Sequence, residues 1–258
     1  MIEGLERFAV TVADHVATVT MRGHPVNAQG VIFRDEIIRV FDAITDTPEV
    51  RAVVLTGEGR AFSAGADLKD RPDLTLSGAY PKHNRSVRAS FDAVLECTKP
   101  VVAAINGAAI GAGAVLASCC DILVAAEEGF LALTEVDVGL AGGVRHILRH
   151  FGPSDARLMA YTAKRIYGPE LLRMRAVSAC VPGERVVEEA TAIARTIAAK
   201  SPLAAQAAKR GFTLTEEMPL RDGYRYEQTQ TRALADTEDS KEAQRAFAEK
   251  RAPVFRGR

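Results

Sequence analysis

Two runs of small residues in this sequence could bring a ligand close to the peptide backbone. The first run, residues 56–68, follows an apolar segment and leads into a polar segment that is predicted to be helical. Its glycines and alanines allow a close approach, and the N–H groups at a helix start are free donors. The alternative interpretation is a tight turn with a helix start and no ligand.

The second run, residues 106–114, has the same character and also follows an apolar segment. Two such turns could direct N–H donors at one carbonyl oxygen, which is the geometry of an oxyanion hole. The alternative is close helix packing through small residues. Neither run has the spacing of GxGxxG or of a Walker A motif, so the sequence does not favour a nucleotide-phosphate site.

The elements that must position these runs are predicted from the hydrophobic pattern. Residues 8–13 and 16–21 are rich in β-branched residues and flank a turn at Asp14 and His15, which is typical of a hairpin. Apolar residues recur at helical spacing over residues 33–44. Short apolar strands are predicted at residues 52–56, 101–105 and 121–125, and a helix of small residues is predicted at about 111–120. Strands that alternate with helices indicate an α/β fold.

Beyond about residue 150 the pattern predicts helices alone, with amphipathic runs at residues 203–210 and 224–250. Residues 70–95 are the least regular stretch. We expect an α/β core over residues 1–195 and a C-terminal helical region, residues 196–258, that mediates oligomerisation.

Composition narrows the class of protein. The chain has 258 residues, with 33 basic and 33 acidic side chains, so its formal net charge of zero gives no electrostatic footprint for nucleic acid or an anionic membrane. It contains no apolar stretch of membrane-spanning length and no signal-peptide pattern. Its 4 cysteines lack metal-site spacing, and we expect no metal, no nucleic-acid partner and a cytoplasmic location.

Further motifs accompany the two small-residue runs in a fixed order. Arg22 precedes Pro25-Val26-Asn27-Ala28, Lys99-Pro100 precedes the second run, and Ser201-Pro202-Leu203 is followed by Lys209 and by the ending from Ala246 to Arg258. Taken together, these residues resemble the enoyl-CoA hydratase/isomerase family, also called the crotonase family, over almost the whole chain.

The resemblance implies a spiral of ββα units in two sheets, with C-terminal helices that form a homotrimer or a dimer of trimers. It implies an acyl-CoA thioester substrate and no cofactor apart from the coenzyme A of that substrate. The oxyanion N–H groups fall on Ala66 and Ala112; the family usually has glycine at the second position, but alanine also carries an N–H. The CoA-binding positions fall on Arg22, Ala64, Asp67, Leu68, Phe247 and Lys250.

Only one of the two catalytic carboxylates that the family resemblance implies is present in this sequence. Family hydratases use two glutamates, and the first position falls here on Val115. The second falls on Glu135 if a gap is accepted before Ala141, whereas a gapless register would put Ala132 there. We favour Glu135, as acid and base, because the Glu-Val-x-x-Gly-Leu pattern matches.

Loss of a general acid or base costs roughly 10²–10⁴-fold in rate, so two-glutamate hydration is in doubt. One carboxylate beside an oxyanion hole suits removal of a proton α to the thioester and its return at the γ-carbon. We therefore expect hydration or double-bond isomerisation of an enoyl-CoA. The alternatives are a CoA-thioester hydrolase, a decarboxylase, a C–C lyase, or a family member that binds CoA esters without catalysis.

Asp137 and three histidines are further candidate site residues. Asp137 would share a face with Glu135 if the segment were extended, and is then a possible second catalytic group; the favoured interpretation is a solvated turn residue. His83 is interpreted as a solvated loop histidine, with a catalytic role as the alternative. His146 and His150 lie four residues apart, but flanking arginines and the lack of a third ligand favour a basic helix face over a metal site.

Overall fold

From β3 to β8, successive strands of the chain belong alternately to two β-sheets. The computed structural model describes residues 2–258, and within them the strands form a six-stranded and a four-stranded sheet. The larger sheet has the order β1 (Phe8–Ala13), β2 (Val16–Met21), β3 (Ala52–Gly57), β5 (Val101–Ile105), β7 (Ile122–Ala126) and β10 (Ala179–Val181). The smaller sheet has the order β4 (Ala61–Ser63), β6 (Ala108–Ile110), β8 (Phe130–Ala132) and β9 (Ile166–Tyr167).

Three successive units repeat the same path. Each parallel strand β3, β5 and β7 of the larger sheet is followed by a short strand, β4, β6 or β8, of the smaller sheet. A helical element then leads back to the larger sheet. These elements are η1 (Leu68–Asp70) with α2 (Ala79–Leu95), α3 (Ala112–Ser118), and η2 (Glu135–Val138) with α4 (Val144–Ile147), α5 (Pro153–Thr162) and α6 (Gly168–Arg173). The predicted succession of ββα units is thus present.

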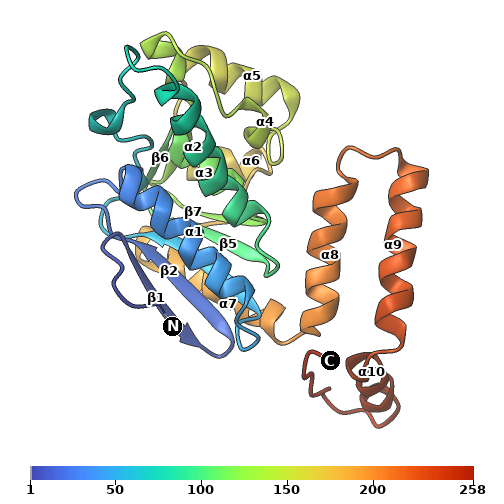
Figure 1. The fold of residues 1–258 in the computed structure, drawn as a ribbon. Coiled ribbons are helices and arrows are strands. Elements are labelled where there is room, and N and C mark those ends of the chain that lie inside the picture. Colours follow the sequence, from blue (N-terminus) through green and yellow to red (C-terminus); the bar gives the residue numbers. More distant parts are fainter. Residues whose placement is uncertain (1) are drawn as a thin grey trace.

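Both faces of strands β3 and β5 in the larger sheet are buried, and successive residues of each strand point to opposite sides. Val53 and Leu55 of β3 join the main core, which also takes in buried side chains of α1 (Val31–Thr45), α2 and α3. Ala52 and Val54 face the other side, where α7 (Val186–Ala198) covers them. The short η3 (Gly183–Arg185) precedes α7. Figure 1 shows these helices on the sheet.

The C-terminal helices stand apart from the sheets. Helices α8 (Pro202–Thr215) and α9 (Leu220–Ala235) run as an antiparallel pair, and α10 (Glu238–Ala248) follows at the end of the pair where α8 begins (Figure 1). Their apolar side chains are largely uncovered in one chain: Phe212 is 80% exposed and Leu220 is 91% exposed. No helix within residues 2–258 combines the length and apolar character needed to cross a membrane.

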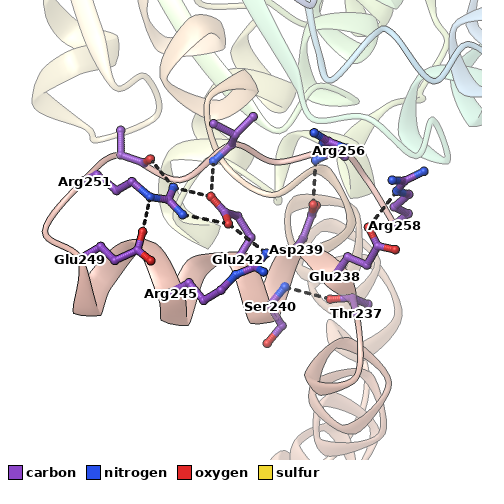
Figure 2. A network of polar contacts seen from close by, with 12 residues as sticks. Thr237, Glu238, Asp239, Ser240, Glu242, Arg245, Glu249, Arg251, Arg256 and Arg258 are labelled. Atoms are coloured by element: carbon purple, nitrogen blue, oxygen red, sulfur yellow. Dashed lines mark hydrogen bonds and ion pairs between the residues drawn. The ribbon is translucent and has the colours of Figure 1, made fainter.

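The end of the chain is held by two carboxylates of α10 (Figure 2). Asp239 is buried, and its carboxylate accepts hydrogen bonds from the N–H groups of Arg256 and Gly257 and from the Ser201 hydroxyl, at 2.7, 3.0 and 3.0 Å. Glu242 accepts from the Arg251 guanidinium and from the Val254 N–H. These contacts tie the last residues to the start of α8.

Several predicted elements differ from the structure. Residues beyond 150 are not purely helical, since they include β9 and β10; strands of two or three residues are too short to show alternation. The irregular stretch 70–95 contains the 17-residue helix α2, whose apolar face is narrow and whose Pro81 is tolerated in the first turn. The run 224–250 is two helices, and the second is capped by the Thr237 hydroxyl.

Candidate active site

Three neighbouring parallel strands place the candidate catalytic groups at one edge of the smaller sheet. Ala66 follows β4, Ala112 follows β6, and Glu135 follows β8, and these strands are adjacent in the sheet. The carboxyl ends of parallel strands lie at the same edge, where α/β proteins commonly bind ligands. Residues that are far apart in the sequence therefore meet in one place.

The turns that carry Ala66 and Ala112 lie against each other. A Cβ atom added to Gly65 would overlap the carbonyl oxygen of Ile110 and would lie 3.1 Å from the Ala112 nitrogen. Gly65 has a φ of +88°, so the turn depends on glycine for both its space and its conformation. Among residues 2–258, neither the Ala66 N–H nor the Ala112 N–H has a hydrogen-bond acceptor. Two free donors are thus available side by side.

Glu135 is the carboxylate that reaches the second of these turns. Its side chain is half-buried at the start of η2, and a Cβ atom on Gly111 would lie only 2.9 Å from its Oε1 atom. Its Oε2 atom is buried and has no hydrogen-bond partner within the described chain. Burial raises the pKa of the Glu135 carboxyl above its usual value of 4.5, partly opposed by the N–H groups of Glu135 and Thr134. A poorly solvated carboxylate next to two N–H donors is equipped to accept a proton.

Val115 occupies an apolar part of the same site. It is 3% exposed, and its methyl group fills the space beside Gly143, which has a φ of +74°. Leu133 packs on the same glycine. Val115 and Leu133 thus form an apolar wall on Gly143, and neither side chain is ionisable.

Glu135 and Asp137 do not share a face, and Asp137 takes the favoured position of a solvated turn residue. A shared face required an extended segment, but residues 135–138 form the 3₁₀ helix η2, in which side chains two positions apart diverge by about 120°. Asp137 is exposed to solvent. The segment coils because the Asp137 N–H donates to the Thr134 carbonyl and Gly139 ends the turn with a φ of +70°.

The early loop, residues 22–30 between β2 and α1, lies along the first small-residue turn, as a CoA-binding role would require. The Ala64 N–H donates to the Val26 carbonyl at 2.9 Å, and the Asp67 carboxylate caps η1 through the Lys69 N–H at 3.0 Å. Leu68 is 67% exposed, and exposed Arg22 lies 3.9 Å from the Glu58 carboxylate. Ala64, Asp67 and Leu68 lie within five residues of one another in this turn, and Arg22 lies at the start of the loop beside it.

Phe247 and Lys250 are not brought to this loop within one chain. Phe247 lies on α10 and Lys250 just beyond it, and α10 lies below the α8–α9 pair, on the other side of the molecule from the start of α1 that follows this loop (Figure 1). Phe247 is 88% exposed.

The candidate histidines take structural positions. His83 lies on α2 rather than in a loop, half-buried, and burial lowers the pKa of its imidazole, with nearby Arg34 acting in the same direction. His146 packs on the Phe91 ring, and the His150 Nε2 atom is 3.2 and 3.1 Å from the carbonyl oxygens of Ser118 and Cys120. In the part of the chain that the structure describes, no cluster of three potential metal ligands occurs.

Gln29 is a residue that the sequence analysis missed. It is 3% exposed and contacts both small-residue turns. A single glutamine inside a loop carries no periodic or spacing signal, so only the fold reveals its contacts.

The fold and the site together define an α/β protein of the crotonase type, with two adjoining turns of free N–H groups and a facing carboxylate. Comparison with known proteins agrees. The family model described as "Enoyl-CoA hydratase/isomerase" matches residues 11–258. The chain therefore belongs to the enoyl-CoA hydratase/isomerase family, a family of enzymes that act on CoA thioesters.

Named relatives and a solved structure support the same assignment. The chain is 33% identical to a probable mitochondrial enoyl-CoA hydratase of Dictyostelium discoideum, over 93% of this chain and 87% of that protein. It is 34% identical to an (E)-benzylidenesuccinyl-CoA hydratase of Thauera aromatica, over 95% and 97%. The crystal structure of an enoyl-CoA hydratase from Bacillus anthracis superposes with a TM-score of 0.92 at 31% identity, covering 98% of this chain and 100% of that one. The predicted fold is confirmed.

Proposed function

We propose that this protein shifts the double bond of a β,γ-enoyl-CoA into conjugation with the thioester, with Glu135 as the proton carrier. The observation that carries the proposal is the half-buried Glu135 carboxylate, which has one unpartnered oxygen and lies against Gly111, next to the Ala112 N–H. A carboxylate whose pKa is raised is a better base than an exposed one.

The proposed reaction proceeds in two proton transfers. Glu135 removes a proton from the α-carbon, and the electron pair moves through the thioester carbonyl to its oxygen. The N–H groups of Ala66 and Ala112 stabilise the resulting enolate oxygen by hydrogen bonding. The neutral Glu135 then returns the proton at the γ-carbon while the double bond forms between the α- and β-carbons. No water, metal or redox partner takes part, so the coenzyme A of the substrate is the only cofactor required.

The apolar wall of the site favours isomerisation over two-carboxylate hydration. Hydration needs a second group to orient and deprotonate water, and buried Val115 stands where the family resemblance expects that carboxylate. Asp137 is exposed on η2 and is poorly placed to replace it. A lone proton carrier needs no second carboxylate.

Hydration of an α,β-enoyl-CoA is the second candidate. It is favoured by the names of the relatives, since the proteins from Dictyostelium discoideum and Thauera aromatica are both described as hydratases. In this reaction Glu135 would act alone on both water and the α-carbon. Thioester hydrolysis, decarboxylation, C–C cleavage and binding without catalysis are further outcomes of the test below.

An absorbance assay of the conjugated thioester distinguishes the candidates. The proposal expects the signal to rise with a β,γ-enoyl-CoA and to remain constant with an α,β-enoyl-CoA. A falling signal with the α,β-ester and no release of free CoA thiol would instead establish hydration, whereas a fall with thiol release would indicate hydrolysis. Glu135→Gln should abolish turnover and leave ligand affinity nearly unchanged, whereas Glu127→Gln, an exposed carboxylate beyond β7, should behave as wild type. Turnover that survives Glu135→Gln would refute the assignment of the base.

We also propose that the protein is a homotrimer or a dimer of trimers, assembled through residues 196–258. The exposed apolar side chains of α8 and α9, such as Phe212, support a covered surface there. A contact of Phe247 and Lys250 with bound CoA would then require α10 of another copy. Sedimentation equilibrium tests the assembly, and a monomer would exclude it.

The four cysteines are free thiols in the structure, and we propose a reducing cytoplasm as the compartment, to be tested by cell fractionation.

A further inference from the structure

Gln29 bonds to both turns that carry the candidate N–H donors. Its backbone N–H donates to the Gly65 carbonyl at 2.8 Å. Its side-chain Nε2 donates to the Ala112 carbonyl and to the Ser63 hydroxyl, both at 3.1 Å. The side chain is 3% exposed, so water does not compete for these bonds. One residue of the early loop thus links the end of β4 to the start of α3.

The bond to Gly65 determines where the Ala66 N–H points. The Gly65 carbonyl and the Ala66 N–H belong to the same planar trans peptide, so they point in opposite directions. Because Gln29 holds that carbonyl on the side of the early loop, the Ala66 N–H is turned to the other side of the segment. The parallel bridge between Gln29 and Ala66 has the same geometry, with the Asp67 N–H facing the Gln29 carbonyl at 3.5 Å.

The bond to Ala112 acts on the second turn. The Ala112 carbonyl lies in the first turn of α3, one peptide unit after the Ala112 N–H. A short helix of seven residues has few hydrogen bonds of its own to hold its first turn in place. The Gln29 side chain adds an external contact there, from the same residue that holds Gly65.

Gln29 is itself held by a buried cation. The Arg34 Nη1 atom donates to the Gln29 carbonyl at 2.8 Å, and its Nε atom donates to the Ser86 hydroxyl of α2 at 3.1 Å. Arg34 is 4% exposed, and no carboxylate of residues 2–258 forms an ion pair with it. Its role in the fold is therefore to connect α1 and α2 to Gln29.

We propose that Gln29 is a positioning residue that sets the distance and direction between the Ala66 and Ala112 N–H groups. This inference rests on the proposed function, in which both N–H groups bind the thioester oxygen. Such donors act mainly on the charge that develops in the transition state. Disturbing their geometry therefore lowers kcat more than it changes KM.

The test uses a thioester that reports on carbonyl polarisation without reacting. The absorbance of para-dimethylaminocinnamoyl-CoA is expected to shift to longer wavelength when the full-length wild-type protein binds it, because the N–H groups draw electron density to the carbonyl oxygen. Gln29→Leu removes both side-chain bonds at nearly constant volume. It should reduce the shift and lower kcat on the order of 10²-fold, with little change in KM.

Two further variants keep the test decisive. Gln29→Glu has the size of glutamine but faces the Ala112 carbonyl with an oxygen, so it should also lose the shift. It provides the test if Gln29→Leu fails to fold. Ser118→Ala is the matched control: it removes a buried hydrogen bond to the Ala114 carbonyl of the same helix, away from the site. It should lower the melting temperature and keep the wild-type shift and kcat.

The outcomes separate this inference from the proposed function. If the wild-type protein neither turns over enoyl-CoA nor shifts the probe, the proposed function fails and the inference fails with it. If the wild-type protein does both, and folded Gln29→Leu or Gln29→Glu keeps the full shift and kcat, only the role of Gln29 is refuted. A loss of kcat in Ser118→Ala equal to that in Gln29→Leu would reduce the role of Gln29 to general stability.

Discussion

Replacing Gly111 with alanine is the most direct perturbation of the distance between Glu135 and the second turn. Gly111 has a φ of +53° and a ψ of −119°, a conformation that residues with a Cβ atom rarely adopt. Holding alanine there costs about 1–3 kcal/mol of the free energy of unfolding. The new Cβ atom would also lie 2.9 Å from Glu135 Oε1, whereas ordinary contact begins at 3.4 Å. The carboxylate must therefore retreat by about 0.5 Å.

This displacement predicts a kinetic loss that is separable from the loss of stability. A misplacement of 1 Å can cost about 10²-fold in rate, so we expect Gly111→Ala to lower kcat for isomerisation by roughly 10-fold to 10²-fold. Gly59→Ala is the matched control, since Gly59 has a φ of +78° and no atom within 4 Å of the added Cβ. It should show a comparable loss of stability and a wild-type kcat.

The assay combines urea unfolding with steady-state kinetics of the three proteins. A Gly111→Ala protein that is destabilised like Gly59→Ala but keeps the wild-type kcat would refute the reasoning.

Four further predictions follow from individual side chains. Because the pKa of Glu135 is raised by burial, kcat/KM should fall as the pH drops through a value above 4.5, and a kcat/KM that stays constant through that range would contradict Glu135 as the base. The folded state binds the Glu135 proton more tightly than the unfolded state, so the contribution of Glu135 to stability is greatest below pH 4.5 and declines as the pH rises through the raised pKa of the folded state. Calorimetry at neutral pH should therefore give Glu135→Gln a higher melting temperature than wild type. A lower melting temperature would contradict the direction of this pKa shift. Because Asp137 is exposed, Asp137→Asn should leave kcat nearly unchanged. Val115→Glu should lower the free energy of unfolding, measured in urea, by about 3 kcal/mol or more, since the introduced carboxylate would be buried without a partner. The Arg251 guanidinium lowers the pKa of Glu242 to about 2, so the Val254 N–H that donates to Glu242 should stay protected from hydrogen exchange until the pH approaches that value. In Arg251→Ala this protection should already be lost nearer pH 4.5. Identical exchange profiles in the two proteins would refute the contact.

The hydrophobic pattern was sufficient for the elements that carry many apolar residues. The hairpin β1–β2, the buried strands β3, β5 and β7, and helix α1 were predicted within a few residues, because their periodicity reflects burial on one or both faces. The small-residue runs were also recognisable as places where backbone N–H groups are accessible. Family motifs in a fixed order then indicated the fold, which the comparison with solved structures confirmed.

The tertiary structure alone decided which groups meet. The short strands β4, β6 and β8 have three residues each and no alternation to detect, yet their adjacency brings Ala66, Ala112 and Glu135 to one edge. The coil of η2 turned Asp137 away from Glu135, because backbone hydrogen bonds rather than side-chain types set that turn. The contacts of Gln29 span 36 residues to Gly65 and 83 to Ala112, and no local pattern encodes pairings of that separation. Sequence determined what could be buried; packing determined which polar atoms would face each other.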